Sequence, residues 1–166
     1  MDRSAQAVAS PATGSLRSTD ESATRRIGQA LGRAARPGSV LALSGPLGAG
    51  KTQLAKGVAA GLGVRSVVNS PTFILMNEHV GRLRLFHIDA YRLDDPEEAL
   101  AAGLLDEREA GGVTVIEWAD RLGAWLPAGR LDLALAFDEA DPQIRHLAWR
   151  AHDAAHARLA REALGR

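Results

Sequence analysis

Eight consecutive residues in the first third of the chain have the types and spacing of a phosphate-binding loop. They read G-x-x-x-x-G-K-T and are Gly45, Pro46, Leu47, Gly48, Ala49, Gly50, Lys51 and Thr52. Glycines let the backbone curl so that successive N–H groups point at an anion. In this pattern the lysine reaches the β- and γ-phosphates of a nucleotide, and the threonine hydroxyl binds magnesium. We therefore expect Lys51 and Thr52 to contact a phosphorylated ligand and its metal ion.

The segments on either side of the loop favour the structure that this motif requires. Residues 39–44 (SVLALS) form a short, mostly apolar run that is typical of a buried parallel strand. Residues 52–62 are predicted to form a helix beginning near Lys51, with Leu54, Val58 and Leu62 on one face. The positive end of that helix dipole would face the anion.

Hydrolysis needs a second protein contact to the metal, usually an acid at the end of a neighbouring apolar strand. Glu117 directly follows the apolar run 113–116 and is the first candidate for a metal or water contact. Asp89 follows the run 83–88 and is the rival candidate. Structural roles stay open for both acids. Glu117 could simply face solvent at a strand end, and Asp89 could cap its strand or pair with Arg92.

Three further side chains have both a functional and a structural interpretation. Thr72, in the tripeptide SPT, stands where many nucleotide hydrolases sense the γ-phosphate and its magnesium. The same tripeptide is also typical of a turn into a strand. His87 is either a base or a core residue of an apolar strand. Trp118 either stacks on a base or a partner, or belongs to the core.

The elements that must position these residues alternate along the chain. Strands are predicted at 39–44, 72–78, 83–88, 113–116, 131–137 and 144–151, and helices at 20–35, 52–62, 96–102, 104–109, 119–125 and 153–164. This order predicts an α/β fold of the P-loop NTPase type, with a largely parallel central sheet, antiparallel additions and flanking helices. The antiparallel additions are a hairpin within 72–88 and the pair within 131–151.

The beginning of the chain differs in composition from the rest. Residues 1–18 are rich in Ala, Ser, Thr, Pro and Gly and are predicted to be a disordered tail. Ser18 and Glu21 have the spacing of a capping box, with Ser18 as the N-cap of the first helix. Residues 19–166 are then predicted to form a single P-loop ATPase domain.

Composition and charge exclude several classes of protein. The chain has 166 residues and a formal net charge of zero, so no basic excess suggests an autonomous nucleic-acid binder. It has no cysteine, which excludes disulfides, zinc–thiolate sites and thiol catalysis. No apolar run approaches the roughly 18 residues of a membrane span, and the N-terminus lacks the apolar segment of a secretory signal. We expect a cytoplasmic protein with no membrane contact.

Four segments together resemble one family. They are the loop 45–52, SPTF at 70–73, HIDAYRL at 87–93 and IEW at 116–118, in this order and at compatible separations. The set resembles TsaE, the small bacterial ATPase family of tRNA threonylcarbamoyladenosine (t6A) synthesis, over roughly residues 20 to 138. The phosphate loop is shared with many proteins, and the other three motifs make the resemblance specific.

The resemblance implies a magnesium-dependent ATPase that supports the TsaB–TsaD complex, which transfers the threonylcarbamoyl group to tRNA. The partners would be TsaD and TsaB, with tRNA contacted only indirectly through them. By motif, the loop with Lys51 and Thr52 holds ATP and Mg²⁺, and Thr72 is the switch-like threonine. Asp89 and Glu117 are the acids around magnesium, and Trp118 lies near the nucleotide.

Two other functions remain as alternatives. A small-molecule or nucleoside kinase uses the same loop, but it needs an acceptor pocket and usually an arginine-bearing lid, for which the sequence shows no pattern. A nucleotide-dependent binding module would bind ATP and turn over negligibly alone. A GTPase is disfavoured because no N-K-x-D stretch is present. No arginine finger is evident within the chain, so we expect slow hydrolysis by the isolated protein and stimulation by its partners.

Overall fold

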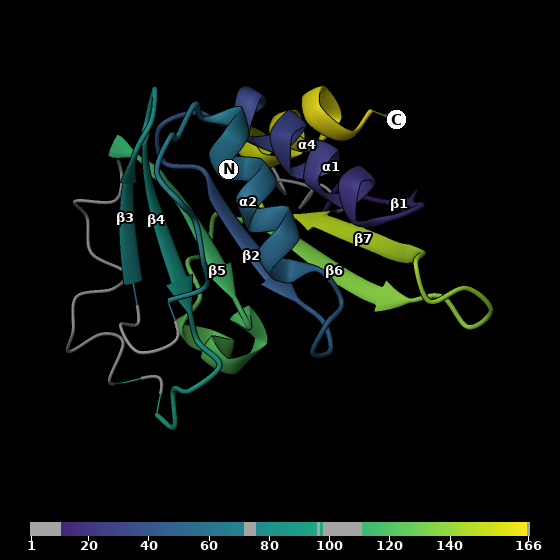
Figure 1. The fold of residues 1–166 in the computed structure, drawn as a ribbon. Coiled ribbons are helices and arrows are strands. Elements are labelled where there is room, and N and C mark those ends of the chain that lie inside the picture. The colour runs from purple at the N-terminus through teal and green to yellow at the C-terminus, as the bar shows by residue number, and fades with distance from the viewer. Residues whose placement is uncertain (1–10, 72–75, 96, 98–110, 166) are drawn as a thin grey trace, which may run out of the picture.

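One seven-stranded sheet organises the chain (Figure 1). The computed structural model describes residues 11–71, 76–95, 97 and 111–165. The strands are β1 (Thr13–Ser18), β2 (Val40–Ser44), β3 (Met76–Val80), β4 (Arg84–Asp89), β5 (Val113–Glu117), β6 (Leu131–Phe137) and β7 (Arg145–Ala151). The helices are α1 (Glu21–Ala34), α2 (Lys51–Gly61), the 3₁₀ segment η2 (Ala119–Trp125) and α4 (Ala154–Leu164).

The centre of the sheet is parallel and its edges are antiparallel. The strand order is β1-β7-β6-β2-β5-β4-β3. Strands β4, β5, β2 and β6 pair in parallel, whereas β3, β7 and β1 add in antiparallel fashion. Every residue of β5 is buried, as expected of a strand that is covered on both faces. The P-loop α/β architecture predicted from the sequence is therefore confirmed, including the hairpin β3–β4 and the pair β6–β7.

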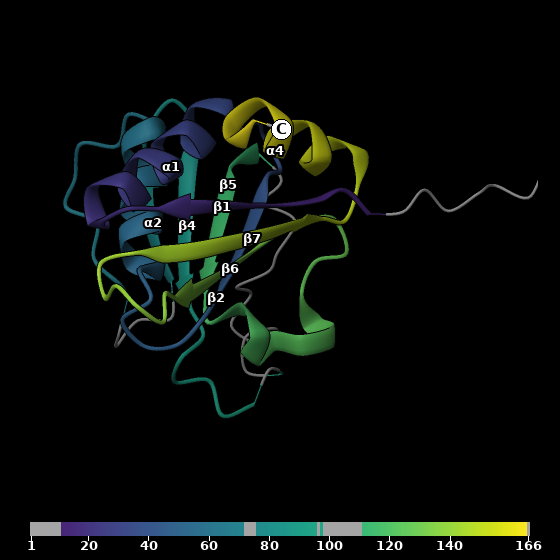
Figure 2. The same ribbon diagram turned by 90° about the vertical axis from the view of Figure 1, so that its right-hand side faces the viewer.

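Helices α1, α2 and α4 cover one face of the sheet, and η2 contributes to the other. The larger core cluster joins these three helices to inward residues of the strands, such as Leu43, Val115 and Leu133. A smaller cluster on the opposite face contains Ile88, Ile116 and Leu122 of η2. Figure 2 shows β1 and β7 in front, with α1 and α4 above them.

Glycines bring α1 and α2 unusually close together. A Cβ on Gly28 would collide with the carbonyl oxygen of Leu54, and a Cβ on Gly57 would collide with that of Arg25. The helices therefore pack backbone to backbone, and α1 holds α2 firmly against the sheet. Because α2 carries the end of the phosphate loop, this contact helps to position the candidate site.

The prediction of a disordered tail at residues 1–18 is wrong for residues 13–18, because these residues form β1. Thr13–Ser18 pairs antiparallel with β7, from Thr13 opposite Arg150 to Ser18 opposite Arg145. The N-cap assignment is also wrong. Asp20 caps α1 through its carboxylate, which accepts the N–H of Ala23 at 2.7 Å. Ser18 lies two residues before Asp20, and its hydroxyl donates to the carbonyl oxygen of Asp20.

Other predicted elements agree with the structure closely or lie outside the described residues. The helix expected at 119–125 is a 3₁₀ segment with a kink at Gly123, whose φ is 49°. The first strand of the hairpin is described only from Met76, since 72–75 lie outside the described residues. The helices predicted at 96–102 and 104–109 also lie outside them, apart from Glu97. Among the described helices, none is long and apolar enough to cross a lipid bilayer.

Candidate phosphate-binding site

The loop between β2 and α2 has the backbone geometry of an anion cradle. Gly45, Gly48 and Gly50 have φ values of 138°, 79° and 105°, a region that favours glycine. A Cβ on Gly45 would also collide with the carbonyl oxygen of Leu135 on β6. Helix α2 then begins at Lys51, and in the described part of the chain no side chain caps its N-terminus. Its first N–H groups are therefore free to bind an anion.

The ammonium group of Lys51 lies inside the mouth of this loop. Its Nζ donates to the carbonyl oxygens of Gly45 and Pro46 at 2.6 and 2.8 Å. The side chain is buried, and that burial lowers its pKa, while the negative charges of Glu117, Asp120 and Asp89 act in the opposite direction. Phosphate oxygens would bind an ammonium group more strongly than neutral carbonyls do, because both partners then carry charge.

Glu117 meets the loop because of the register between β2 and β5. Leu43 pairs with Glu117, which brings the carboxylate beside the start of α2. Thr52 Oγ1 donates to Glu117 Oε1 at 2.6 Å, and Ser70 Oγ donates to Oε2 at 3.0 Å. His87 Nε2 lies 2.8 Å from the same Oε2. The carboxylate is therefore held by groups from three separate segments of the chain.

The electrostatics of Glu117 favour its charged form. The residue is 2 % exposed. Burial alone would raise the pKa of Glu117, but the hydrogen bonds from His87, Thr52 and Ser70 leave it below its usual value. The predicted alternative of a solvent-facing acid is thus wrong, because this carboxylate is buried and fully engaged.

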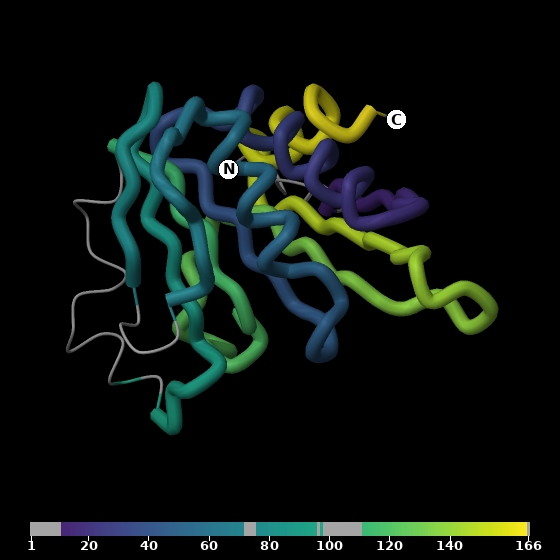
Figure 3. The backbone as a smooth tube through the Cα atoms, viewed as in Figure 1, coloured from purple at the N-terminus to yellow at the C-terminus, as the bar shows by residue number. Residues whose placement is uncertain are grey.

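Asp89 lies next to Glu117 at the same end of the sheet. The two residues are paired in the register of β4 and β5. Ser70 bridges them, since its Oγ lies within hydrogen-bond distance of both Asp89 Oδ2 and Glu117 Oε2, which share its single proton. Asp89 Oδ1 accepts the N–H of Tyr91 at 2.9 Å, so Asp89 does cap the turn after its strand. In Figure 1 the arrowheads of β2, β4 and β5 lie at the same end of the sheet, and Figure 3 traces the same backbone as a tube.

Trp118 lies beside the loop rather than in the interior of the core. Lys51 Nζ is 3.9 Å from the centre of its ring. The ring of Tyr91 packs against it with a centroid distance of 4.8 Å. Trp118 is the only non-glycine residue among those described with a positive φ, 57°. This backbone conformation costs energy for an aromatic residue, which is common at functional sites.

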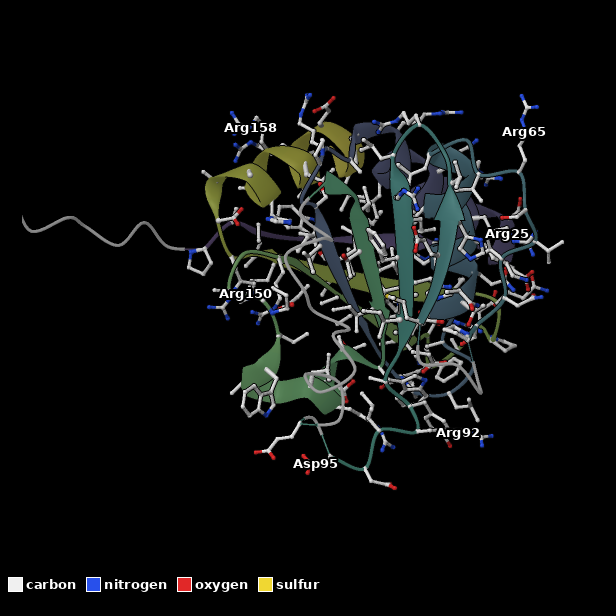
Figure 4. The ribbon with its side chains drawn as sticks, turned by 90° about the vertical axis from the view of Figure 1, so that its left-hand side faces the viewer. Arg25, Arg65, Arg92, Asp95, Arg150 and Arg158 are labelled. Carbon is white, nitrogen blue, oxygen red and sulfur yellow. The ribbon has the colours of Figure 1, made fainter. Side chains whose placement is uncertain are left out.

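Two adjoining clefts share the loop. The first has a volume of about 420 Å³ and is lined by Lys51, Thr52, Ser70, Asp89, Tyr91, Arg92, Glu117 and Trp118, among others. Figure 4 shows Arg92 beyond the carboxyl end of β4. The second cleft, of about 370 Å³, lies on the side of β6 and β7 and reaches Gln143 and Arg145. Both include Gly48 and Gly50, so a ligand on the loop can extend into either cleft.

The structure brings most of the predicted site residues together. The loop, Asp89, Glu117 and Trp118 converge, while Thr72 lies outside the described residues. His87 is fully buried and does not line the cleft, as predicted for a core residue, but it also holds Glu117. The sequence analysis assigned no role to Ser70, although Ser70 is the first residue of the SPT motif. It also did not predict the second cleft, because no local sequence motif marks it.

The protein groups at the site suit Mg²⁺, which needs only one or two protein ligands, better than a metal ion that is coordinated by protein side chains alone. No cluster of three or more His, Cys, Asp or Glu able to hold a metal occurs within the described residues. What the site offers is one hydroxyl and one carboxylate beside a phosphate loop. Mg²⁺ is usually bound in this way, by one or two protein oxygens together with phosphate and water. Thr52 and Glu117 therefore fit the predicted metal.

Comparisons with known proteins agree with this geometry. Residues 18–146 match the family model of the threonylcarbamoyl adenosine biosynthesis protein TsaE. The TsaE protein of Bacillus subtilis is 43% identical over 121 residues, covering 72% of this chain and 75% of that protein. The Treponema pallidum protein is 42% identical over 112 residues, covering 68% and 83%. The crystal structure of Bacillus subtilis YdiB superposes with a TM-score of 0.77 at 32% identity, covering 93% of this chain and 96% of that one.

Proposed function

Because this chain belongs to the TsaE family of threonylcarbamoyl adenosine biosynthesis proteins, we propose that it is the Mg²⁺-dependent ATPase that supports t6A formation by a TsaB–TsaD complex. Its relatives carry the pathway in their names, and the site described above supplies the groups that nucleotide hydrolysis requires. We assign tRNA binding to the partners, because this chain has a formal net charge of zero.

The observation that supports hydrolysis most directly is the hydrogen bond between Thr52 and Glu117. It joins the last residue of the phosphate loop to a buried acid from the neighbouring parallel strand, 2.6 Å apart. These are the two protein groups that hold the metal in P-loop hydrolases. The same loop in a protein that only bound phosphate would not need a buried, charged carboxylate at this position.

Each group has a role that follows from its position. The N–H groups of the loop and of the start of α2 bind the phosphates, and Lys51 neutralises charge on them. Thr52 and Glu117 hold Mg²⁺, which supplies further neutralisation of phosphate charge. Ser70 and Asp89 orient Glu117 from its other side. The nucleoside extends into the second cleft, toward Gln143 and Arg145, because Asp89 and Glu117 line the first cleft.

We expect the isolated protein to hydrolyse ATP slowly, because its site offers few positively charged side chains to the transferring phosphate. Within the described residues, Arg92 is the only arginine that lines the first cleft, and its side chain is exposed. A preorganised arginine at the transferring phosphate raises the hydrolysis rate by about 10³- to 10⁵-fold in related enzymes. We therefore expect the complex to order or supply such a charge, and hydrolysis without it to be slow.

The decisive experiment measures ATP hydrolysis by the purified chain, alone and with TsaB, TsaD and tRNA, and follows t6A formation in parallel. Stimulation by the partners together with many cycles of t6A formation supports the proposal. Hydrolysis that is indifferent to the partners contradicts it. Phosphate transfer to a small acceptor would instead identify the kinase alternative, and nucleotide binding without turnover would identify a binding module.

A further inference from the structure

An arginine cluster lies at the end of the sheet opposite the phosphate loop. Its members are all exposed: Arg33, Arg36, Arg82, Arg158 and Arg161. Helix α1 leads into the amino end of β2 and the turn with Arg82 leads into the amino end of β4, whereas the phosphate loop follows the carboxyl end of β2. Strand β7 runs antiparallel to its neighbour β6, so α4 begins at the amino end as well. Figure 4 shows Arg158 at the top of the view and Arg92, beyond the carboxyl end of β4, at the bottom.

Arg82 joins the cluster to the C-terminus of α1. Its Nη2 donates to the carbonyl oxygens of Gly32, Arg33 and Ala35 at 2.7, 2.9 and 2.7 Å. The last carbonyl groups of a helix lack partners within the helix, so this guanidinium group caps α1. Arg82 therefore lies over the helix turn that carries Arg33 and directly precedes Arg36.

The arginines of α4 lie across a cleft from those of α1. Arg36 Nη2 is 3.5 Å from Glu162 Oε2 on α4. Arg36 and Arg158 both line a cleft of about 580 Å³ between the end of α1 and the start of α4. Arg158 and Arg161 are three residues apart, a spacing that makes side chains neighbours on a helix. Figure 2 shows α1 and α4 next to each other above the sheet, so an anionic group at the cleft meets arginines from both helices.

Few acids balance the charge of the cluster. Among the described residues, Arg36 is the only member that is paired with a carboxylate, and its pair with Glu162 is exposed. Asp153 also lines the cleft, but its Oδ1 accepts the backbone N–H of His156 as the cap of α4 and lies 2.8 Å from His156 Nδ1. Five arginines therefore stand against two acids, one of which already has a structural role.

Acids gather at the other end of the sheet instead. Asp89, Glu117 and Asp120 lie close enough to Lys51 for their charges to act on its ammonium group at the phosphate loop. The formal net charge of zero therefore conceals an uneven distribution of charge between the two ends of the sheet. A local positive potential attracts a polyanion even when the protein as a whole is neutral.

The composition of the cluster favours phosphate groups over a protein surface as its partner. Protein interfaces centre on apolar and aromatic side chains, whereas interfaces with nucleic acids are polar and strongly positive. Of the large exposed hydrophobic residues in the described part of the chain, only Val80 is within two residues of a cluster member in the sequence. Guanidinium groups also bind phosphate oxygens through two parallel hydrogen bonds.

We propose that the arginine cluster binds the phosphate backbone of RNA, as a contact without sequence preference. The identity of the polyanion as RNA rests on the proposed function in t6A formation, whereas the affinity for a phosphate backbone does not. The contact is weak by itself, since non-specific binding of this kind has a Kd of about 10⁻⁴–10⁻⁶ M at physiological salt. It adds to the specific binding of tRNA by the partners. Because the cluster lies opposite the phosphate loop, RNA and ATP bind at the same time.

The first test measures the binding of a fluorescein-labelled RNA duplex to the full chain by anisotropy, over a range of salt concentrations. Arg158→Ala combined with Arg161→Ala removes two exposed charges, and alanine is a good helix former, so α4 persists. We expect this double variant to bind RNA at least about tenfold more weakly. The slope of log K against log salt should become less steep by about 2, because two phosphate contacts are lost.

Arg17→Ala combined with Arg26→Ala is the matched control, because it removes the same charge from two exposed positions outside the cluster. It should change the RNA affinity by less than about twofold, since distant surface charges are screened. Equal losses in the two double variants, or no binding of the duplex at low salt, would overturn the proposal. Normal RNA binding by the cluster variant together with loss of TsaB–TsaD binding would also overturn it, and would identify a protein docking surface instead.

A second test adds a non-hydrolysable ATP analogue and Mg²⁺ to the complex with RNA. The analogue should leave the RNA affinity unchanged, and the cluster variant should hydrolyse ATP without RNA at the rate of the unmodified chain. Competition between the analogue and the duplex would place RNA at the phosphate loop and overturn the assignment to the cluster. If the unmodified chain binds RNA through the cluster but fails to hydrolyse ATP, the proposed function fails while the cluster assignment stands.

Discussion

Replacing Glu117 with glutamine should separate hydrolysis from nucleotide binding. The carboxylate is 2 % exposed and interacts with Thr52 at 2.6 Å, His87 at 2.8 Å and Ser70 at 3.0 Å. Glutamine keeps the size of the side chain and one acceptor oxygen, but it removes the negative charge and turns the second acceptor into a donor. The amide cannot accept from Thr52 on one side and from Ser70 and His87 on the other through two oxygens, as the carboxylate does.

The expected loss is large for hydrolysis and small for binding. Removing one group that stabilises charge in the transition state costs about 10²- to 10³-fold in kcat, or roughly 2.7–4 kcal/mol. Phosphate binding rests on the loop N–H groups and on Lys51, which Glu117→Gln does not touch. We therefore expect the Kd of ATP to change by less than about threefold, which is roughly 0.7 kcal/mol.

The assay pairs single-turnover hydrolysis, in the presence of TsaB and TsaD, with calorimetric titration of a non-hydrolysable ATP analogue. Glu78→Gln is the matched control, because Glu78 is a surface acid on β3 that pairs with Arg84. Its hydrolysis and binding should equal those of the unmodified protein. Equal losses of binding and hydrolysis in Glu117→Gln would show that Glu117 is structural. Undiminished hydrolysis would refute its placement at the metal.

Three further predictions concern the loop, the helix pair and the surface. Lys51→Ala should weaken nucleotide binding about 10- to 100-fold, because a charged hydrogen bond to phosphate contributes about 1.5–3 kcal/mol. An unchanged nucleotide affinity in a fluorescence titration would contradict the assignment of the loop as the phosphate-binding site. Gly28→Ala should lower the free energy of unfolding by about 1–3 kcal/mol in urea melts, because the added methyl group would collide with the carbonyl oxygen of Leu54. An unchanged urea midpoint of unfolding would argue against the close packing of α1 on α2. The pKa of Asp138 should be about 2 in an NMR titration, because His146 and two backbone N–H groups bond to its carboxylate. It should rise toward 3.8 in His146→Ala. Because the folded value is the lower one, any contribution of Asp138 to stability is present above pH 3.8 and is lost as the pH falls toward 2.

Much of the site could be predicted because its motifs are local. The run 45–52 contains its own glycines, its lysine and the first turn of a helix, so its function is visible without any distant contact. The apolar run 113–116 followed by Glu117 likewise indicates a buried strand with an acid at its carboxyl end. Alternating strands and helices were enough to predict a parallel α/β sheet.

The first strand could not be predicted in the same way. Residues 13–18 carry one leucine and small or polar neighbours, so they bury little apolar surface by themselves. Their stability as a strand comes from hydrogen bonds to β7, an element more than a hundred residues later in the chain. A composition that resembles a disordered tail is therefore compatible with an ordered edge strand.

The residue types thus specified a phosphate loop, a parallel sheet and two acids at strand ends. Which side chains meet depends on strand register, which is set by pairing between distant segments and by packing against the helices. Register places Asp89 opposite Glu117, and it places Glu117 beside Leu43 next to the loop. The neighbouring strand β4 also brings His87 within 2.8 Å of the Glu117 carboxylate, a contact that no local pattern contains. Local motifs indicated the chemistry, and the long-range packing of the sheet assembled the carboxylate, its hydrogen-bond partners and the two clefts.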